Sequence, residues 1–281
     1  MDYKAKKSLG QNFLKSKLIA KKIVSAGKLQ KGDTVLEIGP GKGMLTEYLL
    51  ETGAKVVAVE KDDLLIGLLS ERFAKELKSG QFGLIHKDIL EFDPTIYNLQ
   101  HNNYSIIANI PYYITGALFK KFLESDYQPK SMVLLVQKEV AQRIVGHNPT
   151  SPRLRGARES ILSISVKAYG TPKIALKVQS RFFSPQPKVD SAVLTIENIS
   201  KTLFTDTLTG AKHLGISEKW FFEVVKAGFA HKRKVLIKNL EKVAKKEQLK
   251  EIFQQLGISE KSRPENIHTD QWISLSKLLA R

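Results

Sequence analysis

The sequence predicts an α/β protein: a doubly wound, mostly parallel sheet followed by a small all-helical domain. Up to about residue 200, short apolar runs typical of buried strands alternate with segments of helical periodicity, and the loops between them are short. Beyond residue 200 only helical patterns remain. We therefore expect one domain over residues 1–200 and a second, helical domain over residues 201–281.

Five strands are expected in the first part of the chain, each an apolar run bounded by turn residues. They lie at residues 35–38, 55–60, 82–86, 105–108 and 132–136. Helices are expected after four of these strands, at residues 44–51, 62–78, 117–123 and 138–145. Because strands and helices alternate, the strands should run parallel, and ligands should bind outside their carboxyl ends.

The remaining elements are a sheet edge and a helical tail. Residues 147–156, with two prolines and two arginines, are expected to form an exposed loop. Residues 161–168 and 189–196 are expected to be two further strands that form an antiparallel edge. Helices are expected at residues 219–230, 232–244, 247–256 and 270–279.

The chain of 281 residues has a net charge of +17, and most of this charge lies near its ends. The basic N-terminal segment, residues 1–31, carries nine lysines and one aspartate, and residues 201–281 carry sixteen basic and nine acidic residues. Solvated lysine-rich surfaces are common in soluble proteins. Two basic blocks around a nearly neutral middle nevertheless favour a polyanionic partner, and we expect nucleic acid.

Composition excludes several kinds of chemistry. The absence of cysteine rules out disulfides, cysteine nucleophiles and thiolate zinc sites. The six histidines are scattered without metal-ligand spacing, so we expect no metal site. No apolar run approaches the roughly 18 residues of a membrane span, and no signal-peptide pattern opens the sequence. We expect a soluble, cytoplasmic protein without a membrane partner.

A glycine loop and two acids follow the first three predicted strands. The loop has glycines at 39, 41 and 43, which is not the G-x-G-x-x-G spacing of dinucleotide sites. Glycines let a ligand approach the backbone closely, and the following helix offers free N–H groups. Glu60 ends the second strand and could accept from ribose hydroxyls, while Asp88 ends the third and could accept from an adenine amino group. Taken alone, Glu60 also fits a solvated strand end and Asp88 a helix cap.

Together these features describe a site for S-adenosylmethionine, with Gly39, Gly41, Glu60 and Asp88 as cofactor-binding residues. The sulfonium methyl of that cofactor is already an electrophile. Its transfer therefore needs no metal, cysteine or strong base, and the chain offers no obvious set of those groups.

The stretch N-I-P-Y follows the fourth strand and is hard to explain by core packing. It resembles the Asn-x-Pro-Tyr motif of methyltransferases that act on the exocyclic amino group of adenine. The Asn109 side-chain oxygen and the Ile110 carbonyl could hold the amino hydrogens, so that the nitrogen lone pair faces the methyl group. Tyr112 would stack on the base, worth about 1–3 kcal/mol, and Pro111 would fix the turn. The plainer alternative is a strand-end turn with packed tyrosines.

Further motifs run in order through the chain and resemble the ribosomal RNA small-subunit adenine dimethyltransferase family, whose loss gives kasugamycin resistance. In chain order they read KSLGQNFL, VLEIGPGKGMLT, VVAVEKD, HKDIL, IIANIPYYIT, LLVQKEVAQRI, FFSPQPKVDSAVL, VVKAGFAHKRKVLIKNL and RPENI. The first of these resembles the N-terminal signature that folds over the cofactor in that family. The resemblance implies a Rossmann-like S-adenosylmethionine-dependent methyltransferase sheet.

The resemblance also implies roles for individual residues. It implies cofactor contacts from Asn12, Leu14, Gly39, Glu60, Asp88 and Asn109, and a catalytic loop of Asn109, Ile110, Pro111 and Tyr112. Phe183 would lie where the family places a second aromatic against the target base, although core packing is an alternative role for it.

The implied reaction is the transfer of four methyl groups, which gives two adjacent N6,N6-dimethyladenosines near the 3′ end of small-subunit (16S) rRNA during ribosome biogenesis. The implied partner is small-subunit rRNA in a 30S-like pre-ribosomal particle, with its phosphates bound by the basic ends, including the rRNA-binding helical domain at residues 201–281. The implied oligomeric state is a monomer.

One segment departs from the family, and several alternatives remain open. Between residues 143 and 166 the family has a Tyr-Gly-Arg-Leu-Ser-like run that this chain lacks. Large-subunit rRNA adenine methyltransferases of the macrolide-resistance type share the glycine loop and Asn-x-Pro-Tyr, but KVDSAV, HKRK and RPENI favour the small-subunit enzymes. A DNA adenine methyltransferase would carry a larger target-recognition domain. A non-catalytic RNA-binding assembly factor on the same fold fits poorly with an intact Asn109 and Tyr112, and a dehydrogenase fits least.

Overall fold

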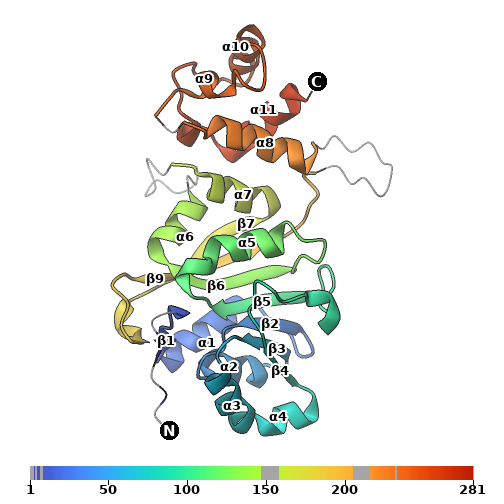
Figure 1. The fold of residues 1–281 in the computed structure, drawn as a ribbon, viewed down its shortest axis with the longest axis vertical. Helices are drawn as coiled ribbons and strands as arrows, with labels where there is room; N and C mark the ends of the chain where they lie inside the picture. The colour runs from blue at the N-terminus through green and yellow to red at the C-terminus, as the bar shows by residue number, and fades with distance from the viewer. Residues whose placement is uncertain are drawn as a thin grey trace. The chain divides into compact units, whose positions relative to one another are not determined.

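The computed structural model describes residues 3, 5–6, 9–146, 158–204, 216–231 and 233–280. The chain divides into two compact units (Figure 1). The first comprises Met1–Ala141 and Thr171–Ile199, and the second Gln142–Gly170 and Ser200–Arg281. The loop expected at residues 147–156 lies outside the described residues.

The first unit holds a mixed seven-stranded sheet and a two-stranded one. The strands are β1 (Phe13–Leu14), β2 (Thr34–Ile38), β3 (Lys55–Glu60), β4 (Phe82–His86), β5 (Tyr104–Asn109), β6 (Ser131–Gln137), β7 (Thr171–Val178), β8 (Phe183–Ser184) and β9 (Ser191–Glu197). The large sheet has the order β4-β3-β2-β5-β6-β9-β7, in which β9 alone runs in the direction opposite to the other six strands. In the small sheet, β1 pairs antiparallel with β8.

The helices of the first unit follow the strands in alternation. They are α1 (Lys17–Ala26), α2 (Met44–Glu51), α3 (Asp63–Arg72), α4 (Ala74–Ser79) and α5 (Thr115–Leu123), and α6 (Lys138–Val145) follows β6. From β2 the chain first builds outward through β3 to β4, then returns to place β5 and β6 on the other side of β2. The point between β2 and β5, where the strand order reverses, is where sheets of this kind bind ligands.

The second unit is helical in its described residues. Its helices are α7 (Ile161–Tyr169), α8 (Glu218–Gly228), α9 (Leu236–Leu240), α10 (Lys246–Gln255) and α11 (Thr269–Leu279). Trp272 of α11 is fully buried and its ring stacks on Phe229 at a centroid distance of 5.5 Å. The Tyr169 ring of α7 packs against the Phe204 ring at a centroid distance of 5.2 Å. A residue that precedes β7 in the sequence therefore shares a helical core with one that follows β9.

The predicted fold class is confirmed, and the five parallel strands fall within about one residue of their expected bounds. The expected helix over residues 62–78 is two helices, because the backbone at Phe73 leaves the helical region with φ −112° and ψ 32°. Helix α1 was not expected. The boundary at residue 200 coincides with one junction between the units, while residues 142–170 pack with the helical unit.

The strand expected at residues 161–168 was wrong: this segment is helix α7. Its β-branched residues favour a strand, but Ser160 and Ser163 form a capping box that starts a helix. The antiparallel partner of β9 is instead β7, which the sequence analysis missed. Pro172 and the exposed Lys173 and Lys177 disguise this strand, and all three are tolerated because β7 is an edge strand with one exposed side.

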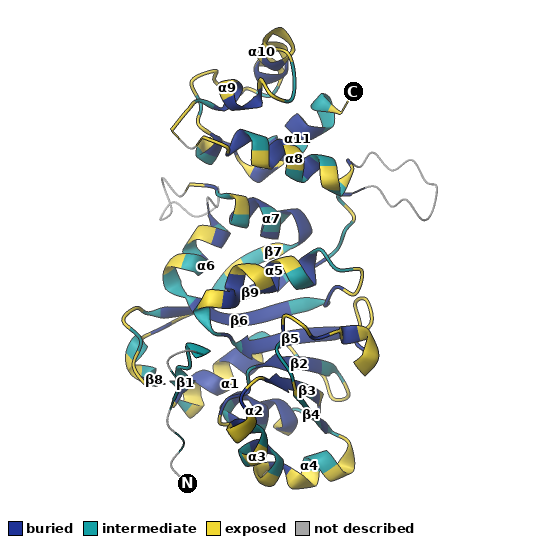
Figure 2. Cartoon of the chain, viewed as in Figure 1, coloured by how far each residue is buried: buried dark blue, intermediate teal, exposed yellow. Residues whose placement is uncertain are grey.

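Burial explains why these strands could be predicted from the sequence. Strands β2, β5, β6 and β9 are buried almost throughout, which matches their continuous apolar runs (Figure 2).

Within the described residues, no helix is long and apolar enough to cross a membrane.

Candidate active site

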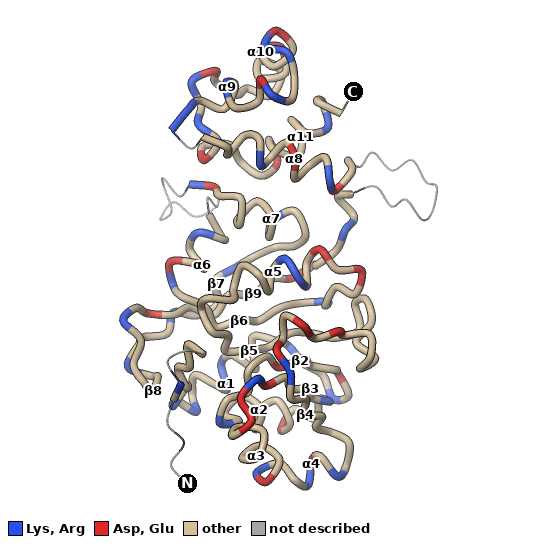
Figure 3. Tube along the Cα trace, in the orientation of Figure 1, with Lys and Arg blue, Asp and Glu red and all other residues tan. Residues whose placement is uncertain are grey.

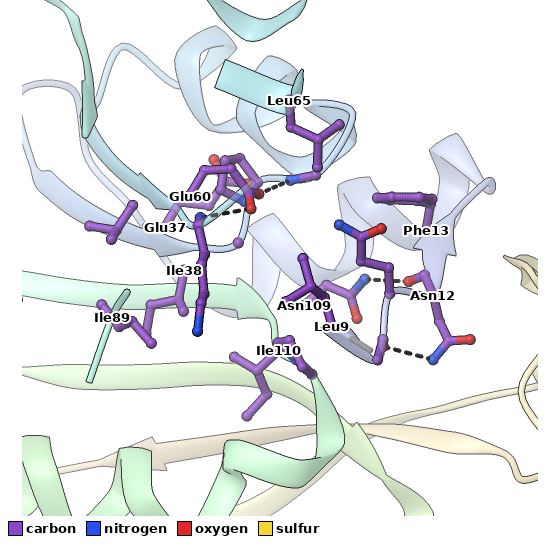
Figure 4. A pocket seen from close by; sticks show the side chains of 18 of the residues that line it. Leu9, Asn12, Phe13, Glu37, Ile38, Glu60, Leu65, Ile89, Asn109 and Ile110 are labelled. Carbon is purple, nitrogen blue, oxygen red and sulfur yellow. Dashed lines mark hydrogen bonds between the residues drawn. The ribbon is translucent and has the colours of Figure 1, made fainter. Parts of the chain in front are cut away.

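A cavity opens at the carboxyl ends of β2, β3, β4 and β5, at the point where the strand order reverses (Figure 4). Its empty volume is about 1020 Å³ including the open mouth, and its wall comes from residues 9–14, 37–42, 44–45, 59–61, 65, 87–89 and 109–114. The glycine loop, both predicted acids and the N-I-P-Y stretch therefore meet in one place. This juxtaposition follows from parallel strands ending at the same edge.

The glycine loop presents bare backbone to the cavity. Gly39 and Gly41 both have left-handed backbones, with φ +62° and +60°, which only glycine adopts without strain. A Cβ atom on Gly39 would meet no other atom within 4 Å, whereas one on Gly41 would lie 2.9 Å from the Phe13 ring. A ligand can thus approach the loop closely, and Phe13 covers it from the N-terminal side.

Glu60 is held rigidly at the end of β3. Its Oε1 accepts from the backbone N–H groups of Lys61 at 2.8 Å and Asp62 at 3.0 Å, and its Oε2 accepts from Gly41 at 3.2 Å. Burial raises the pKa of Glu60, although these three donors oppose that effect. Each carboxylate oxygen can accept more than one hydrogen bond, so a fixed acceptor for hydroxyl donors remains at the cavity wall.

Glu37 is a site residue that the sequence analysis did not single out. It is 1% exposed, its Oε2 accepts from the Thr46 hydroxyl at 2.7 Å, and burial raises its pKa to about 8. A cationic ligand group in the cavity would favour its ionised form. The available signal was a single acid inside the otherwise apolar strand T-V-L-E-I.

Asp88 lies at the rim and is engaged by protein groups. Its Oδ2 pairs with Lys61 Nζ at 2.8 Å, and its Oδ1 accepts from the Leu90 N–H at 2.9 Å. The hydrogen bond from Lys61 lowers the pKa of Asp88, so it stays ionised. The ion pair between Lys61 and Asp88 could not be predicted from strand patterns, because it joins the ends of two different strands.

Asn109, the last residue of β5, is oriented by the N-terminal segment. Its Nδ2 donates to the backbone carbonyl of Asn12 at 3.0 Å (Figure 4). Because a carbonyl only accepts, the amide nitrogen must face Asn12, and the amide oxygen is left to accept from another group. The Asn12 side chain in turn donates to the carbonyl of Gly10 at 3.2 Å.

The rest of the N-I-P-Y stretch forms a tight turn at the cavity. Ile110 is buried, Pro111 and Tyr112 are half-buried, and the Tyr112 hydroxyl lies 2.7 Å from Ser191 Oγ. Burial raises the pKa of Tyr112, so its phenol stays neutral. Tyr113 is 64% exposed, which leaves a flat ring on the surface beside the cavity.

Leu14 and Phe183 are joined by strand pairing. Leu14 in β1 lies opposite Phe183 in β8, and both are buried, at 5% and 1% exposure. Phe183 packs in the core and is not among the residues that line the cavity, whereas Phe182 is half-buried beside the Arg181 guanidinium. The structure therefore brings together every predicted site residue except Phe183. Its expected place against a target base stays a prediction.

The chain belongs to the ribosomal RNA adenine dimethylase family. The model of that family matches residues 2–281. A relative from Dehalococcoides mccartyi is 38% identical over 97% of this chain and 87% of its own length, and one from Fusobacterium nucleatum is 36% identical over 99% and 98%. Both are named ribosomal RNA small subunit methyltransferase A.

Solved structures agree with this family. A dimethyladenosine transferase from Plasmodium falciparum is 25% identical, with a TM-score of 0.72 over 94% of this chain and 95% of its own. The 23S rRNA methyltransferase ErmE superposes with a TM-score of 0.76 over 96% of this chain and 100% of its own, but its 22% identity shows the fold alone. The protein is a Rossmann-like rRNA methyltransferase, and its cofactor is S-adenosylmethionine.

The cavity suits this cofactor on its own evidence. The open face of Gly39 admits a ligand to the backbone, and Glu60 offers a fixed acceptor for hydroxyl groups. Glu37 offers a buried carboxyl group whose ionised form would be stabilised by a cationic group of the ligand. Within the described part of the chain, no group of three His, Asp or Glu side chains could hold a metal ion.

Proposed function

We propose that this protein transfers methyl groups from S-adenosylmethionine to N6 of two adjacent adenosines near the 3′ end of small-subunit rRNA. The observation that carries the proposal is Asn109, an amide fixed by the Asn12 carbonyl at the end of β5, in the same cavity as the glycine loop and Glu60. The relatives' name, ribosomal RNA small subunit methyltransferase A, supports the choice of subunit.

The cofactor would be held along the β2, β3 and β4 ends. The glycine loop at Gly39 and Gly41 would face it, Glu60 would accept from its ribose hydroxyls, and Asp88 would accept from its adenine amino group. Asn12, Leu14 and Asn109 complete the wall on the N-terminal side. When bound, S-adenosylmethionine supplies an electrophilic methyl group on a sulfonium.

The protein's own contribution to the reaction is to position a poor nucleophile. The lone pair of the adenine amino group is delocalised into the ring. The Asn109 amide oxygen and the Ile110 carbonyl would accept its two hydrogens, which favours a more tetrahedral nitrogen with its lone pair toward the methyl group. Tyr112 would stack on the base, and Pro111 fixes the turn that presents it.

A base swung out of its helix needs an anchored aromatic surface and an acceptor at fixed distances. Tyr112 is anchored through its hydroxyl on Ser191, and Asn109 through its amide on Asn12. Phe183 would supply a second ring only in a substrate-bound arrangement, because it is packed in the core here.

The expected partner is small-subunit rRNA in a 30S-like particle, met by a monomer in the cytoplasm. Exposed basic residues of the second unit support this partner, with a concentration around the start of α9 and of α10 (Figure 3). Those around these two helix starts are Arg233, Lys234, Lys238, Lys242, Lys245 and Lys246. Phosphate contacts of this kind supply affinity that falls steeply with salt.

The deciding experiment offers labelled S-adenosylmethionine and the protein to unmethylated small subunits, large-subunit RNA and DNA in parallel, and then maps the modified base. We expect dimethyladenosine near the 3′ end of small-subunit rRNA. Label in large-subunit RNA would replace the proposal with the macrolide-resistance activity. Cofactor binding without label in any nucleic acid would replace it with a non-catalytic assembly factor.

A further inference from the structure

Asp62 is a buried carboxylate just beyond Glu60 that no step of the proposed reaction uses. Its side chain is fully buried, yet four groups donate to it. Tyr3 donates its hydroxyl at 2.6 Å, Gln11 its amide at 3.2 Å, and Lys6 its ammonium at 3.0 Å. The fourth donor is the backbone N–H of Leu64 at 3.1 Å, which makes Asp62 the N-cap of α3.

Helix capping alone does not account for this arrangement. An N-cap needs one acceptor, and asparagine serves there as well as aspartate. The neighbouring Asp63, in the first turn of the same helix, has a side chain that is 82% exposed. Burying a carboxylate is costly unless it is paired and hydrogen-bonded, so the three N-terminal donors are what make the burial of Asp62 stable.

The three donors also hold one another. Gln11 Oε1 accepts from the Lys6 backbone N–H at 2.7 Å and lies 2.8 Å from the Tyr3 hydroxyl. The Tyr3 ring meets the Phe13 ring edge to face at 5.7 Å, and Lys42 Nζ lies within 6 Å of both ring centroids. The N-terminal segment is thereby clamped across the glycine loop.

Gln11, which is part of this clamp, directly precedes Asn12, whose carbonyl orients the Asn109 amide. Gln11 is bound to Asp62, and the next residue, Asn12, supplies the carbonyl that accepts from Asn109 at 3.0 Å. A backbone carbonyl is placed only by the chain on either side of it. Here one side is held by Asp62 and the other by the pairing of β1 with β8.

We propose that Asp62 is a positioning residue for methyl transfer: by holding Tyr3, Lys6 and Gln11, it places the Asn12 carbonyl that orients the Asn109 amide. The proposal rests on the role proposed above for Asn109. In this proposal Asp62, which follows β3 on the side of the cofactor, controls the orientation of Asn109, which ends β5 on the side of the methyl acceptor. Loss of the clamp would let the amide rotate and present its N–H groups, rather than its oxygen, to the target amino group.

The test is Asp62→Asn in the full-length protein. Asparagine keeps the size and the cap, but it removes the charge opposite Lys6 and turns an N–H donor toward groups that also donate. We expect kcat for methyl transfer to fall about 10- to 100-fold, as for misplacement of a reacting group by about 1 Å. The RNA KM should stay at its wild-type value, and amide hydrogen exchange of residues 9–14 should become faster. The melting temperature should fall only slightly, because the Lys6 side chain is 41% exposed and water can replace its lost partner. Asp63→Asn is the matched control and should change none of these.

A second variant identifies the interaction. Lys6→Met removes the cationic donor, and in the double variant with Asp62→Asn the loss in kcat should be no greater than the larger single loss, because both break the same contact. Additive losses would overturn the clamp. A much lower melting temperature with equal losses in kcat and RNA affinity would assign Asp62 a purely structural role.

Hydrogen exchange is measured without RNA, so the two proposals can fail separately. A wild-type protein that methylates no RNA would overturn the proposed function. An Asp62→Asn protein that exchanges faster at residues 9–14 but turns over at the wild-type rate would overturn only the positioning role.

Discussion

At the scale of single residues, the proposed site would work by orienting groups that are chemically ordinary. Asn109 is an uncharged amide, oriented by the hydrogen bond that its Nδ2 donates to the Asn12 carbonyl. Glu60 is shaped by three backbone N–H groups rather than by an ion pair. Both residues are therefore testable by substitutions that change hydrogen bonding and little else.

Replacing Asn109 with alanine should lower methyl transfer roughly 100- to 1,000-fold, as does the loss of one preorganised hydrogen bond to a transition state. RNA affinity should be unchanged, because the contact is made to a single amino group. Asn109→Asp should also be impaired, since it keeps an acceptor but cannot donate to Asn12. Single-turnover rates with unmethylated subunits and filter-binding constants measure the two effects. Near-normal turnover of the alanine variant would contradict the assigned role, and Asn103→Ala, at an exposed turn, serves as control.

Replacing Glu60 with alanine should weaken S-adenosylmethionine binding about 10- to 100-fold, the range of hydrogen bonds to a charged group. The RNA dissociation constant should not change, because Glu60 is buried away from solvent. Calorimetry with the cofactor and filter binding with RNA give the two constants. Equal losses would point to misfolding of the glycine loop instead, and Glu71→Gln, an exposed acid on α3, controls for the change in charge.

At the scale of elements, close helix packing in the second unit depends on one glycine. Gly228, the last residue of α8, faces the fully buried ring of Trp272 in α11. A Cβ there would lie 2.3 Å from Trp272 Cη2 and 2.9 Å from Leu236 Cδ1. The two helices thus approach each other at a distance that any side chain would prevent.

Gly228→Ala should reduce the free energy of unfolding by about 1–3 kcal/mol, the usual cost of overpacking a core. Gly67→Ala is the matched control: Gly67 is exposed within α3, its Cβ would meet no atom within 4 Å, and alanine should stabilise the helix by about 0.5–1 kcal/mol. Urea unfolding followed by fluorescence suits Gly228, because both tryptophans lie in the second unit. Circular dichroism, which reports on the helices of both units together, suits the Gly67 variant. An unchanged stability of the Gly228 variant would mean that Trp272 shifts without cost.

At the scale of the whole molecule, the effect of basic charge on RNA binding has to be tested without disturbing the fold. Truncation at residue 200 would strip α7 of its packing partners, because Tyr169 rests on Phe204 and Phe222. Substitution of exposed charges tests RNA binding without that damage. Arg233, Lys234 and Lys238 are exposed between α8 and the end of α9.

Changing Arg233, Lys234 and Lys238 together to glutamine should weaken RNA binding and lower the slope of log affinity against log salt by about 3, since each phosphate contact contributes about 1. Binding titrations at several salt concentrations give this slope. The same change at Lys55, Lys75 and Lys78, which are exposed in the first unit, should leave it nearly unchanged. Equal effects of the two triple variants would mean that net charge alone attracts the RNA.

The sequence alone was sufficient for what depends on short-range pattern. Buried strands are continuous apolar runs and strand ends carry turn residues, so the sheet, its parallel direction and the edge at which the cavity lies could all be predicted. The glycine loop, Glu60, Asp88 and N-I-P-Y were found because each is a local signal at a strand end. Parallel strands then bring such signals together without further information.

Only the tertiary structure decided what depends on contacts distant in sequence. Residues 161–168 have a composition that suits strand or helix, and the cap at Ser160 together with packing selected the helix. Asp62 lies 51 positions from Gln11 and Asn109 lies 97 from Asn12, separations at which no local pattern reports a partner. Local patterns set backbone conformation, but a buried polar group must find its partners wherever the fold places them. For that reason the residues proposed to carry the chemistry could be named from the sequence, whereas the groups that contact them could not.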